Sequence, residues 1–328
     1  MVTPIRYSGN AAAAPMRTAA IKRLYWTFRS RGARATLKEL MFPHNWLGDC
    51  VWSIDDYRRI FGRFPNLLAP RRFSEHLLRL KLSRDARSEL RARISDKEFV
   101  KTYVETKLGN SFTPTTIAVL RSKREALHFR YPDTCIIKPT HMSGEVIIRN
   151  GEMREPDPAK IARWFDSNYY NAAREPNYRR LSPKVMVEER LVSSGQHSIP
   201  DYKVFCFHGQ PKIIQVDADR YVRHRRSFYS PNWRVLPFGM IYPRLAEPVP
   251  RPARLSEMLD AAKRISVDFT FVRVDFYLLD SAILVGEITN FPEACRTRFE
   301  PDQADLLAGR LFVDSGADVE RLFHAILP

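Results

Sequence analysis

Residues 269–292 read FTFVRVDFYLLDSAILVGEITNFP, and this stretch decides the fold that we predict. Two runs rich in β-branched and aromatic residues flank the polar residues 280–281, a pattern that predicts a β-hairpin. Successive side chains of a strand point to opposite faces of its sheet. On the first strand one face is therefore wholly apolar, and the other carries Arg273, Asp275 and Tyr277.

The register of this hairpin decides whether two carboxylates meet. A loop with an odd number of residues, such as 280–282, places Asp275 opposite Glu287. Arg273 then stands opposite Thr289 on the same face. A two-residue turn would instead send the two carboxylates to opposite faces.

Two carboxylates that face each other suggest a metal site. They repel, and a divalent cation removes that cost. Oxygen-only ligands suit a hard ion such as Mg²⁺, which usually binds one or two carboxylates together with substrate phosphates. Arg273 beside them could neutralise charge on a transferring phosphoryl group. An ion-pair cluster on a half-exposed sheet is the alternative, because structural networks also gather charges.

The composition is typical of a soluble globular protein. The chain has 328 residues, 44% of them hydrophobic, which is enough for two domains or one elaborated domain. Its four cysteines show no Cys-x-x-Cys spacing, which argues against a zinc site or a disulfide framework. No apolar run could cross a bilayer and no secretory signal is visible, so we predict a cytoplasmic protein. The net charge of +16 calls for a polyanionic partner: nucleic acid, an anionic membrane surface or phosphorylated substrates.

Residues 16–40 predict a basic amphipathic helix. Ile21, Leu24 and Phe28 recur at helical spacing among lysines and arginines, and the first acidic residue is Glu39. Such a helix suits an anionic membrane surface, which would place the protein at the inner face of the membrane. A helix packed on its own protein and an organelle transit peptide are the alternatives.

Neither G-x-x-x-x-G-K-[ST] nor G-x-G-x-x-G occurs, so the usual signals of P-loop and Rossmann nucleotide sites are missing. A distributed set of charged residues follows the chain instead. Lys97 opens a predicted helix, and Lys138 ends a short buried strand. The small-residue loop 140–145 comes next, and its backbone N–H groups could approach a phosphate. A later strand ends in Glu188 and Glu189, and a second hairpin follows.

In this order the set resembles the ATP-grasp fold, and more narrowly the TupA-like ATP-grasp family of polysaccharide gene clusters, over roughly residues 57–309. The segments that carry the resemblance are Ser95-Asp96-Lys97, Ile137-Lys138-Pro139, Val187–Leu191, Asp201–Phe207 with Gly209, Arg273–Tyr277 and Gly286–Thr289. The resemblance implies an α+β fold in which two subdomains grip ATP between antiparallel sheets, preceded by a helical N-terminal region. We predict a basic tail and amphipathic helix at 1–50, a helical lead-in at 51–115, a small subdomain at 116–190 and a catalytic subdomain at 191–328.

The resemblance also implies residue roles. The ATP-binding side chains would be Lys97, Lys138, His141, Ser143, Gly144, Glu188, Glu189 and Asp201. The catalytic residues would be Arg273, Arg220 and Lys203, and the Mg²⁺ ligands would be Asp275, Glu287 and Thr289. Whether Glu188 or Glu189 reads the adenine side stays open. Many ATP-grasp ligases have Asn where this chain has Thr289, so Asn290 is an alternative ligand. After this strand, where a glycine-rich segment is common, the chain has Pro-Glu-Ala-Cys-Arg at residues 292–296.

The implied function is an ATP- and Mg²⁺-dependent carboxylate–amine ligase that acts through an acyl-phosphate. It would attach an amino acid or peptide to a surface polysaccharide or its precursor. The partners would be ATP, a carboxylate, an amine and an anionic polysaccharide precursor. The basic, aromatic segment 221–226 could hold that anionic acceptor or could be a solvated loop.

Other functions remain open. They are an ATP-dependent sugar kinase or phosphotransferase of polysaccharide biosynthesis, a glycosyltransferase-associated ATP-binding protein, and a basic module that binds nucleic acid electrostatically. Nucleic acid is the weakest candidate partner, because no nucleic-acid-binding motif is recognisable.

Overall fold

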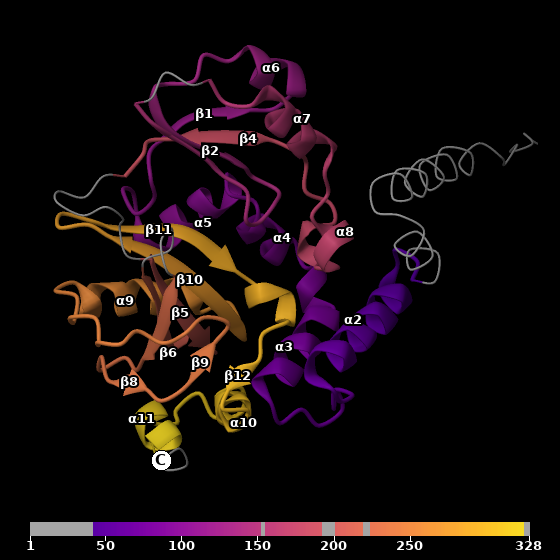
Figure 1. The fold of residues 1–328 in the computed structure, drawn as a ribbon, viewed down its shortest axis with the longest axis vertical. Helices are drawn as coiled ribbons and strands as arrows, with labels where there is room; N and C mark the ends of the chain where they lie inside the picture. The colour runs from indigo at the N-terminus through magenta and orange to yellow at the C-terminus, as the bar shows by residue number, and fades with distance from the viewer. Residues whose placement is uncertain (1–41, 152–154, 192–200, 219–223, 325–328) are drawn as a thin grey trace, which may run out of the picture. The chain divides into compact units, whose positions relative to one another are not determined.

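The computed structural model describes residues 42–151, 155–191, 201–218 and 224–324 (Figure 1). Contacts within the chain separate a unit that ends at Asp56 from a unit that begins at Tyr57, and α2 (Trp46–Phe61) crosses this boundary. The helix and membrane contact predicted at 16–40 lie outside the described residues. No described helix is long and apolar enough to span a membrane. The predicted division at residues 50, 115 and 190 stays a prediction.

Antiparallel sheets with helices around them make up the unit from Tyr57 onward, which confirms the predicted α+β class. The smaller sheet has the order β1 (Thr116–Leu120), β4 (Val185–Glu188), β2 (Thr134–Pro139) and β3 (Ile147–Asn150). The larger sheet has the order β11 (Ile283–Thr289), β10 (Phe271–Leu278), β5 (Asp201–Phe207), β6 (Gln210–Ala218), β7 (Arg225–Tyr229) and β8 (Val235–Leu236). A further pair joins β9 (Gly239–Met240) to β12 (Phe299–Glu300).

Short helices connect and cover the strands. The α-helices are α3 (Phe73–Leu82), α4 (Glu89–Ser95), α5 (Phe99–Leu108), α6 (Lys123–His128), α7 (Pro158–Asp166), α8 (Tyr170–Ala173), α9 (Leu255–Ser266), α10 (Gln303–Arg310) and α11 (Val319–His324). The 3-10 helices are η1 (Asp85–Arg87), η2 (Pro176–Tyr178) and η3 (Pro292–Cys295). In the smaller sheet, Ile137 and Val187 pack in one apolar cluster with Trp164 of α7.

One face of the larger sheet is apolar along the whole of β10. Val272, Val274 and Phe276 are buried in the same cluster as Ala262 and Ile265 of α9, as the alternation of the strand predicts. These residues form the core on the side of the sheet that α9 covers (Figure 1).

The opposite face of the larger sheet changes character along β10. At its start the rings of Phe271 and Phe207 lie 5.3 and 6.1 Å from that of Phe73 on α3. Two and four residues further along the strand stand Arg273 and Asp275, both buried. The aromatic half of this face packs against helices, and the charged half is free to form a site.

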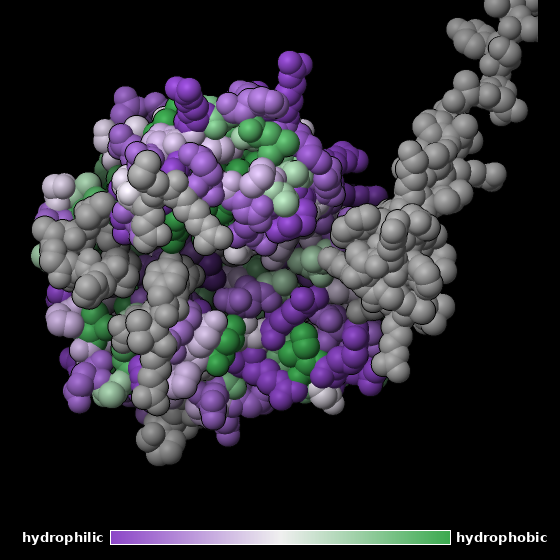
Figure 2. All heavy atoms as spheres, turned by 45° about the horizontal axis from the view of Figure 1, so that its top comes forward, coloured by the Kyte–Doolittle hydropathy of each residue, from purple (hydrophilic) through white to green (hydrophobic). Residues whose placement is uncertain are grey.

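Charged side chains are placed mainly at the surface. The face drawn in Figure 2 is mostly hydrophilic, and its apolar residues lie in small separate groups. This distribution agrees with a chain that is 27% charged. Buried charges, such as those on β10, therefore need individual explanation.

Gly309 on α10 lies against the chain just before α3. A Cβ built at Gly309 would lie 2.1 Å from the carbonyl oxygen of Arg71 and 2.8 Å from the carbonyl carbon of Arg72. Alanine is normally about 1 kcal/mol better than glycine inside a helix. We predict that Gly309→Ala nevertheless lowers the free energy of unfolding by about 2 kcal/mol or more, because backbone atoms cannot move aside without opening the packing.

Urea denaturation measures this effect. Gln303→Ala, at an exposed position of the same helix, is the control and should stay within about 0.5 kcal/mol of the wild type. A Gly309→Ala protein as stable as the wild type would show that α10 does not depend on this close approach.

Candidate active site

The hairpin of β10 and β11 brings two carboxylates face to face. Asp275 pairs with Glu287, and Arg273 pairs with Thr289, which is the predicted register. Burial would raise the pKa of Glu287, but Lys97 and Arg273 lower it below its usual range. The opposed carboxylates are therefore stabilised by cations around them.

The connection between the two strands differs from both loops considered from the sequence, the odd-numbered loop 280–282 and the two-residue turn. It is the segment 279–282, closed by a 2.8 Å hydrogen bond from its first N–H to its last carbonyl. An even-numbered loop alone would send the carboxylates to opposite faces. A β-bulge beside Asp275 leaves Gly286 unpaired and shifts the register back by one residue. Glycine suits the bulge because a Cβ would lie 2.6 Å from the Tyr277 ring.

Asp275 is held by Arg273 in a two-point ion pair. Nε and Nη2 of Arg273 donate to the two carboxylate oxygens of Asp275, each at 2.7 Å, and Nη2 also donates to Thr289 Oγ1 at 3.1 Å. Burial raises the pKa of Asp275, and Arg273 opposes this effect. Burial would lower the pKa of Arg273, but Asp275 raises it. Since a carboxylate offers about four lone-pair positions, about two on Asp275 stay open for a further ligand.

Lys203 on β5 is surrounded by carboxylates. Its Nζ contacts Asp201 and lies 3.4 Å from Asp217 Oδ2 and 3.9 Å from Asp275 Oδ2. Asp217 in turn accepts a 2.6 Å hydrogen bond from Arg226 Nε. Burial would raise the pKa of Asp217, but Arg226 and Lys203 lower it well below its usual range. Charges of opposite sign thus alternate across neighbouring strands, so no member of this set is buried unpaired.

The smaller sheet contributes a second charged set around Glu188. Its Oε2 lies 2.5 Å from Lys138 Nζ, and its Oε1 lies 2.6 Å from Lys101 Nζ. Glu188 is 3% exposed, and burial would raise its pKa, but the two lysines lower it. Lys101 Nζ also donates to Pro114 O at 2.5 Å and to Thr116 Oγ1 at 2.6 Å, which uses all three of its N–H groups. Glu188 is therefore a fixed anchor that holds Lys138 in position.

Lys97 joins the two charged sets. Its Nζ lies 4.0 Å from Glu287 Oε1 on β11 and donates to the carbonyl oxygen of Met142 after β2. Its backbone N–H donates to Thr140 O at 3.0 Å. Burial lowers the pKa of Lys97, and Glu287 offsets part of that effect. A side chain predicted to bind phosphate and one predicted to bind metal thus stand next to each other, although Lys97 lies between α4 and α5 and Glu287 lies on β11.

The loop 140–145 turns its histidine inward. His141 is 2% exposed, and its Nε2 lies 3.0 Å from the carbonyl oxygen of Trp164. Burial lowers the pKa of His141, so the imidazole is neutral near pH 7. In the same loop Ser143 is partly exposed, and Gly144, which has φ +79°, is exposed. Glycine adopts such a φ without strain.

The remaining predicted residues differ in their surroundings. Glu189 is exposed, and its N–H donates to Thr115 O at 3.0 Å. A ligand can therefore reach Glu189 without breaking the ion pairs of Glu188. Asp201 already has a cation partner within the larger sheet. Arg220 lies outside the described residues.

Thr289 and Asn290 have different partners. Asn290 is 3% exposed, and its Oδ1 accepts from Arg91 Nη1 at 2.8 Å. Its Nδ2 donates to Ser95 Oγ at 2.9 Å and to Arg91 O at 3.2 Å. Both ends of this amide therefore tie β11 to α4. Thr289, which pairs with Arg273, is the residue that lies beside the carboxylates.

Sequence reasoning missed Lys101. A signal exists for it, because Lys101 lies one helical turn after Lys97 and so falls on the same face of the helix. The anchoring of Glu188 depends on this second lysine.

Sequence reasoning also missed the segment 169–178, which carries no recognisable motif. Glu175 is 4% exposed, and burial raises its pKa to about 7, with Lys81 opposing the effect. The charge of Glu287 raises the pKa of both Glu175 and Tyr178, so the segment lies within electrostatic reach of the carboxylate pair.

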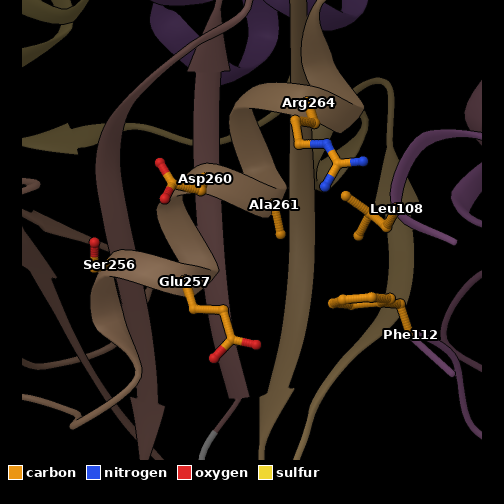
Figure 3. A pocket seen from close by; sticks show the side chains of 7 residues that line it. All are labelled: Leu108, Phe112, Ser256, Glu257, Asp260, Ala261 and Arg264. Atoms are coloured by element: carbon orange, nitrogen blue, oxygen red, sulfur yellow. The ribbon is translucent and has the colours of Figure 1, made fainter.

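A separate pocket of about 350 Å³ lies beside α9 (Figure 3). It is lined by Leu108, Phe112, Ser256, Glu257, Asp260, Ala261 and Arg264. None of these side chains belongs to the charged sets above. The pocket therefore adds nothing to the site.

A comparison with known protein families gives a match over most of the chain. Residues 75–313 match the profile of the TupA-like ATP-grasp family. No curated protein matches the sequence.

Solved structures show only distant likeness. D-alanine–D-alanine ligase from Bacillus anthracis is 17% identical with a TM-score of 0.37, over 72% of this chain and 66% of that one. The ATP-grasp ligase PsnB, complexed with a phosphomimetic variant of its minimal precursor, Mg and ADP, is 12% identical with a TM-score of 0.37, over 92% of this chain and 75% of that one. The chain spans 61–66% of the length of the D-alanine–D-alanine ligases, which is less than two thirds. The family match therefore carries the assignment.

The two neighbouring residues at the end of β11 give a paired test. Asn290→Ala leaves the buried Arg91 guanidinium without one acceptor, so we predict a loss of about 2 kcal/mol in the free energy of unfolding. Thr289→Ala removes one partly buried hydrogen bond and should cost about 1 kcal/mol. In a Mg²⁺ titration with ATP present, Thr289→Ala should need more metal and Asn290→Ala should behave as the wild type. The reverse pattern would make Asn290 the metal ligand.

Glu175 gives a pH test. Its pKa is about 7 in the folded protein against an ordinary value of 4.5, so between these pH values the carboxyl group binds a proton on folding. Folded-state stability from this group is complete below pH 4.5 and falls as pH rises towards 7, by roughly 3 kcal/mol in total. The stability of Glu175→Gln relative to that of the wild type should therefore increase as pH rises across this window. Above pH 7 the difference between the two proteins should stay constant.

Chemical denaturation at a series of pH values measures the difference. The exposed Glu189→Gln is the control and should follow the wild-type curve. Parallel curves for Glu175→Gln and the wild type would show that Glu175 ionises normally.

Proposed function

The chain belongs to the TupA-like ATP-grasp family, and on that premise we propose that it is an ATP- and Mg²⁺-dependent carboxylate–amine ligase. Family membership and the ATP-grasp fold confirm two predictions from the sequence. ATP is the nucleotide that ATP-grasp ligases use. The observation that carries the proposal is that Lys97 lies 4.0 Å from Glu287, which pairs with Asp275, and that Lys97 and Lys138, from separate elements, both lower the pKa of Glu287.

The donor set fits Mg²⁺. Asp275 and Glu287 offer carboxylate oxygens in register, and Thr289 adds a hydroxyl beside them. Within the described part of the chain no cluster of three or more acidic, histidine or cysteine side chains could enclose a metal by itself. That agrees with Mg²⁺, which usually takes one or two carboxylates and completes its shell with phosphates and water. Bound there, the ion would offset the negative charge of the ATP phosphates.

The residues of this chain would supply binding and electrostatic stabilisation. Lys97 and Lys138 would bind the ATP phosphates. The loop 140–145, which contains Ser143 and Gly144, would cover these phosphates. Arg273, next to the carboxylates, would stabilise the negative charge of the transition state. Lys203 would keep the carboxylates of the larger sheet in place. No nucleophilic side chain is required, because positioning and charge supply most of the rate in phosphoryl transfer.

The proposed reaction has two steps. An oxygen of the substrate carboxylate attacks the γ-phosphorus of ATP, and the bond to ADP breaks. The amine nitrogen then attacks the carbonyl carbon of the acyl-phosphate, phosphate leaves with the electron pair, and the amine loses a proton. Glu189 and Asp201, at the ends of β4 and β5, would face the adenosine.

The finer substrate assignment rests on charge and family. We propose a surface polysaccharide or its precursor as the acceptor that receives an amino acid or peptide. Of the basic segment 221–226, Arg226 is committed to Asp217 and Arg225 donates to Arg244 O at 2.9 Å. His224 stacks on Tyr242 with ring centroids 3.7 Å apart. Residues 221–223 of the segment lie outside the described residues, so their contact with the acceptor stays a prediction.

Nucleotide-dependent thermal stabilisation tests the proposal. Mg²⁺ with ATP should raise the melting temperature, since a ligand at about 100 times its Kd adds roughly 2.7 kcal/mol of stability. EDTA should weaken the shift, and GTP should give a smaller one. Glu287→Gln should remove the metal dependence, because Glu287 is a metal-side carboxylate, and Lys138→Ala should weaken ATP binding.

The control makes the same chemical change elsewhere. Glu257→Gln, at an exposed position on α9, should keep the full Mg-ATP shift. ADP release should then require both a carboxylate and an amine. A phosphorylated sugar formed without any amine would replace the ligase by a kinase, and the absence of a nucleotide shift in the wild type would remove the ATP site.

A further inference from the structure

The loop 140–145 contains a run of unpaired backbone N–H groups. Within the described part of the chain, the N–H groups of residues 142–145 have no hydrogen-bond partner. Successive N–H groups without internal partners bind anions in many proteins. In the proposed function this loop covers the phosphates of ATP. The contacts that hold the loop in place therefore bear directly on how these N–H groups meet a phosphate.

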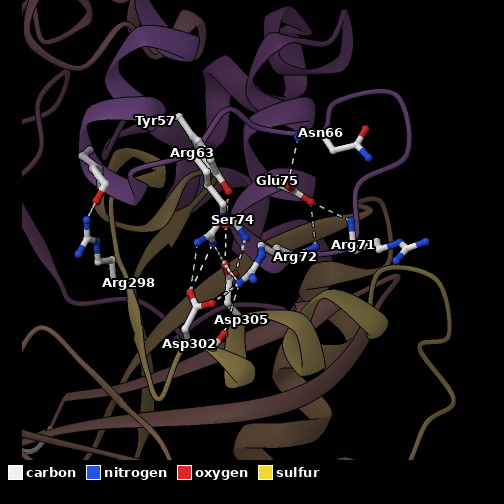
Figure 4. A network of polar contacts seen from close by, with 11 residues as sticks. Tyr57, Arg63, Asn66, Arg71, Arg72, Ser74, Glu75, Arg298, Asp302 and Asp305 are labelled. Carbon is white, nitrogen blue, oxygen red and sulfur yellow. Dashed lines mark hydrogen bonds and ion pairs between the residues drawn. The ribbon is translucent and has the colours of Figure 1, made fainter.

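The carboxylate of this loop does not bind the backbone beside it, unlike a carboxylate elsewhere in the protein. Glu75, which is 6% exposed, accepts hydrogen bonds from three backbone N–H groups of the loop before α3, at 3.0, 2.9 and 3.2 Å (Figure 4). That buried carboxylate satisfies the backbone of its loop. The side chain of Glu145 instead contacts two residues of α7, and it leaves the N–H groups of its own loop unpaired.

Both flanks of the loop 140–145 bind the same residue of α7. His141 Nε2 lies 3.0 Å from the carbonyl oxygen of Trp164, and Trp164 Nε1 donates to Glu145 Oε2 at 3.3 Å. Trp164 is 2% exposed and belongs to the apolar cluster of the smaller sheet. An anchor that is itself fixed in the core thus supports the loop on both sides of its centre.

Lys160 adds a second contact between α7 and the end of the loop. It lies one helical turn before Trp164, on the same face of the helix. Its Nζ lies 3.4 Å from Glu145 Oε2 and donates to the carbonyl oxygen of Val146 at 3.0 Å. The same Nζ lies 5.7 Å from the centre of the Trp164 ring. Glu145 therefore has a hydrogen-bond donor and a cation as neighbours, both from α7.

The start and the centre of the loop are held by other parts of the chain. Thr140, which is 0% exposed, accepts a hydrogen bond from the backbone N–H of Lys97 at 3.0 Å. Lys97 Nζ donates to the carbonyl oxygen of Met142. At the centre the hydroxyl groups of Ser143 and Tyr169 interact. These contacts use carbonyl oxygens and side chains of the loop, so its central N–H groups stay unpaired.

We propose that Glu145 is a positioning residue for ATP: held by Trp164 and Lys160, it fixes the loop 140–145 so that the unpaired N–H groups bind the phosphates. The inference rests on the proposed function and assigns a role to a side chain that need not touch the nucleotide. A loop that is fixed before binding loses less conformational freedom when the ligand arrives. Release of Glu145 should therefore weaken the binding of the phosphate chain and leave the binding of the nucleoside unchanged.

Isothermal titration calorimetry on the full chain with Mg²⁺ tests this role, with ATP and AMP as probes. Glu145→Ala should lose about fivefold or more in affinity for ATP, because the loop loses a hydrogen bond to a charged group. Its affinity for AMP, which lacks the β- and γ-phosphates, should stay within about twofold of the wild-type value. Glu145→Gln keeps an oxygen that accepts from Trp164 Nε1 and loses only a partly exposed ion pair. It should bind ATP within about twofold of the wild type.

Trp164→Phe tests the same hydrogen bond from the other side. The change keeps an aromatic ring in the core and removes the indole donor, so it should weaken ATP binding by about fivefold. Adding it to Glu145→Ala should cost less than about twofold more, because both changes remove one bond. Losses that multiply in the double variant would show that the two residues act separately and would overturn the proposal.

The matched control removes an ion pair elsewhere on α7. Asp166 Oδ2 lies 2.9 Å from Lys123 Nζ, and Asp166→Ala should bind both nucleotides as the wild type does. Unchanged melting temperatures will show that the variants are folded. A wild type that does not bind Mg-ATP would remove the ATP site, and the proposed function with it. If the wild type binds Mg-ATP, the positioning role alone is overturned by a Glu145→Ala protein that binds ATP equally well, that loses as much affinity for AMP, or that loses no more than Asp166→Ala.

Discussion

The charged half of the larger sheet depends on one constraint: carboxylates buried at close range must each keep a cation. Asp275 and Glu287 oppose each other across β10 and β11, and an isolated pair of this kind would be destabilising. Arg273 neutralises the first, Lys97 stands beside the second, and Lys203 links the pair to the carboxylates further across the sheet. Removing one member of such a set leaves its partner buried and unpaired, which costs several kcal/mol. The positions of these side chains are therefore fixed together.

The same constraint joins the two sheets. Lys138 on β2 would repel Lys97 if both stood alone, and Glu188 offsets its charge. Lys101 then balances the second oxygen of Glu188 and, through two further acceptors, fixes the end of β4 to α5 and β1. Phosphate-binding lysines need to be held apart from each other and still within reach of one ligand. For the two lysines proposed to bind phosphate, the anchored Glu188 beside Lys138 and Glu287 beside Lys97 meet both requirements.

Strand alternation was sufficient to predict the faces of β10, but the pairing of Asp275 with Glu287 depended on the length of the loop as well. It could not predict how that pairing arises, because a bulge at Gly286 is a local backbone feature that compensates for an even-numbered loop. The burial of His141 depends on α7, which is distant in sequence and supplies the Trp164 carbonyl. A sequence motif therefore cannot reveal a side-chain role that depends on tertiary packing. Glu175 illustrates the same limit, since its raised pKa comes from burial and no neighbouring residue signals it.

The net charge of +16 can be interpreted only when the buried arginines are distinguished from the exposed ones. Some are structural: Arg91 is fully buried between α4 and β11, and Arg273 belongs to the carboxylate pair. Such residues bind acceptors inside the protein and present no charge to a partner. Others, such as Arg71 and Arg93, are exposed and present their charge to solvent. The electrostatic field of a protein acts on a partner only where it reaches solvent. The surface arginines, and not the total net charge, therefore decide what this protein attracts.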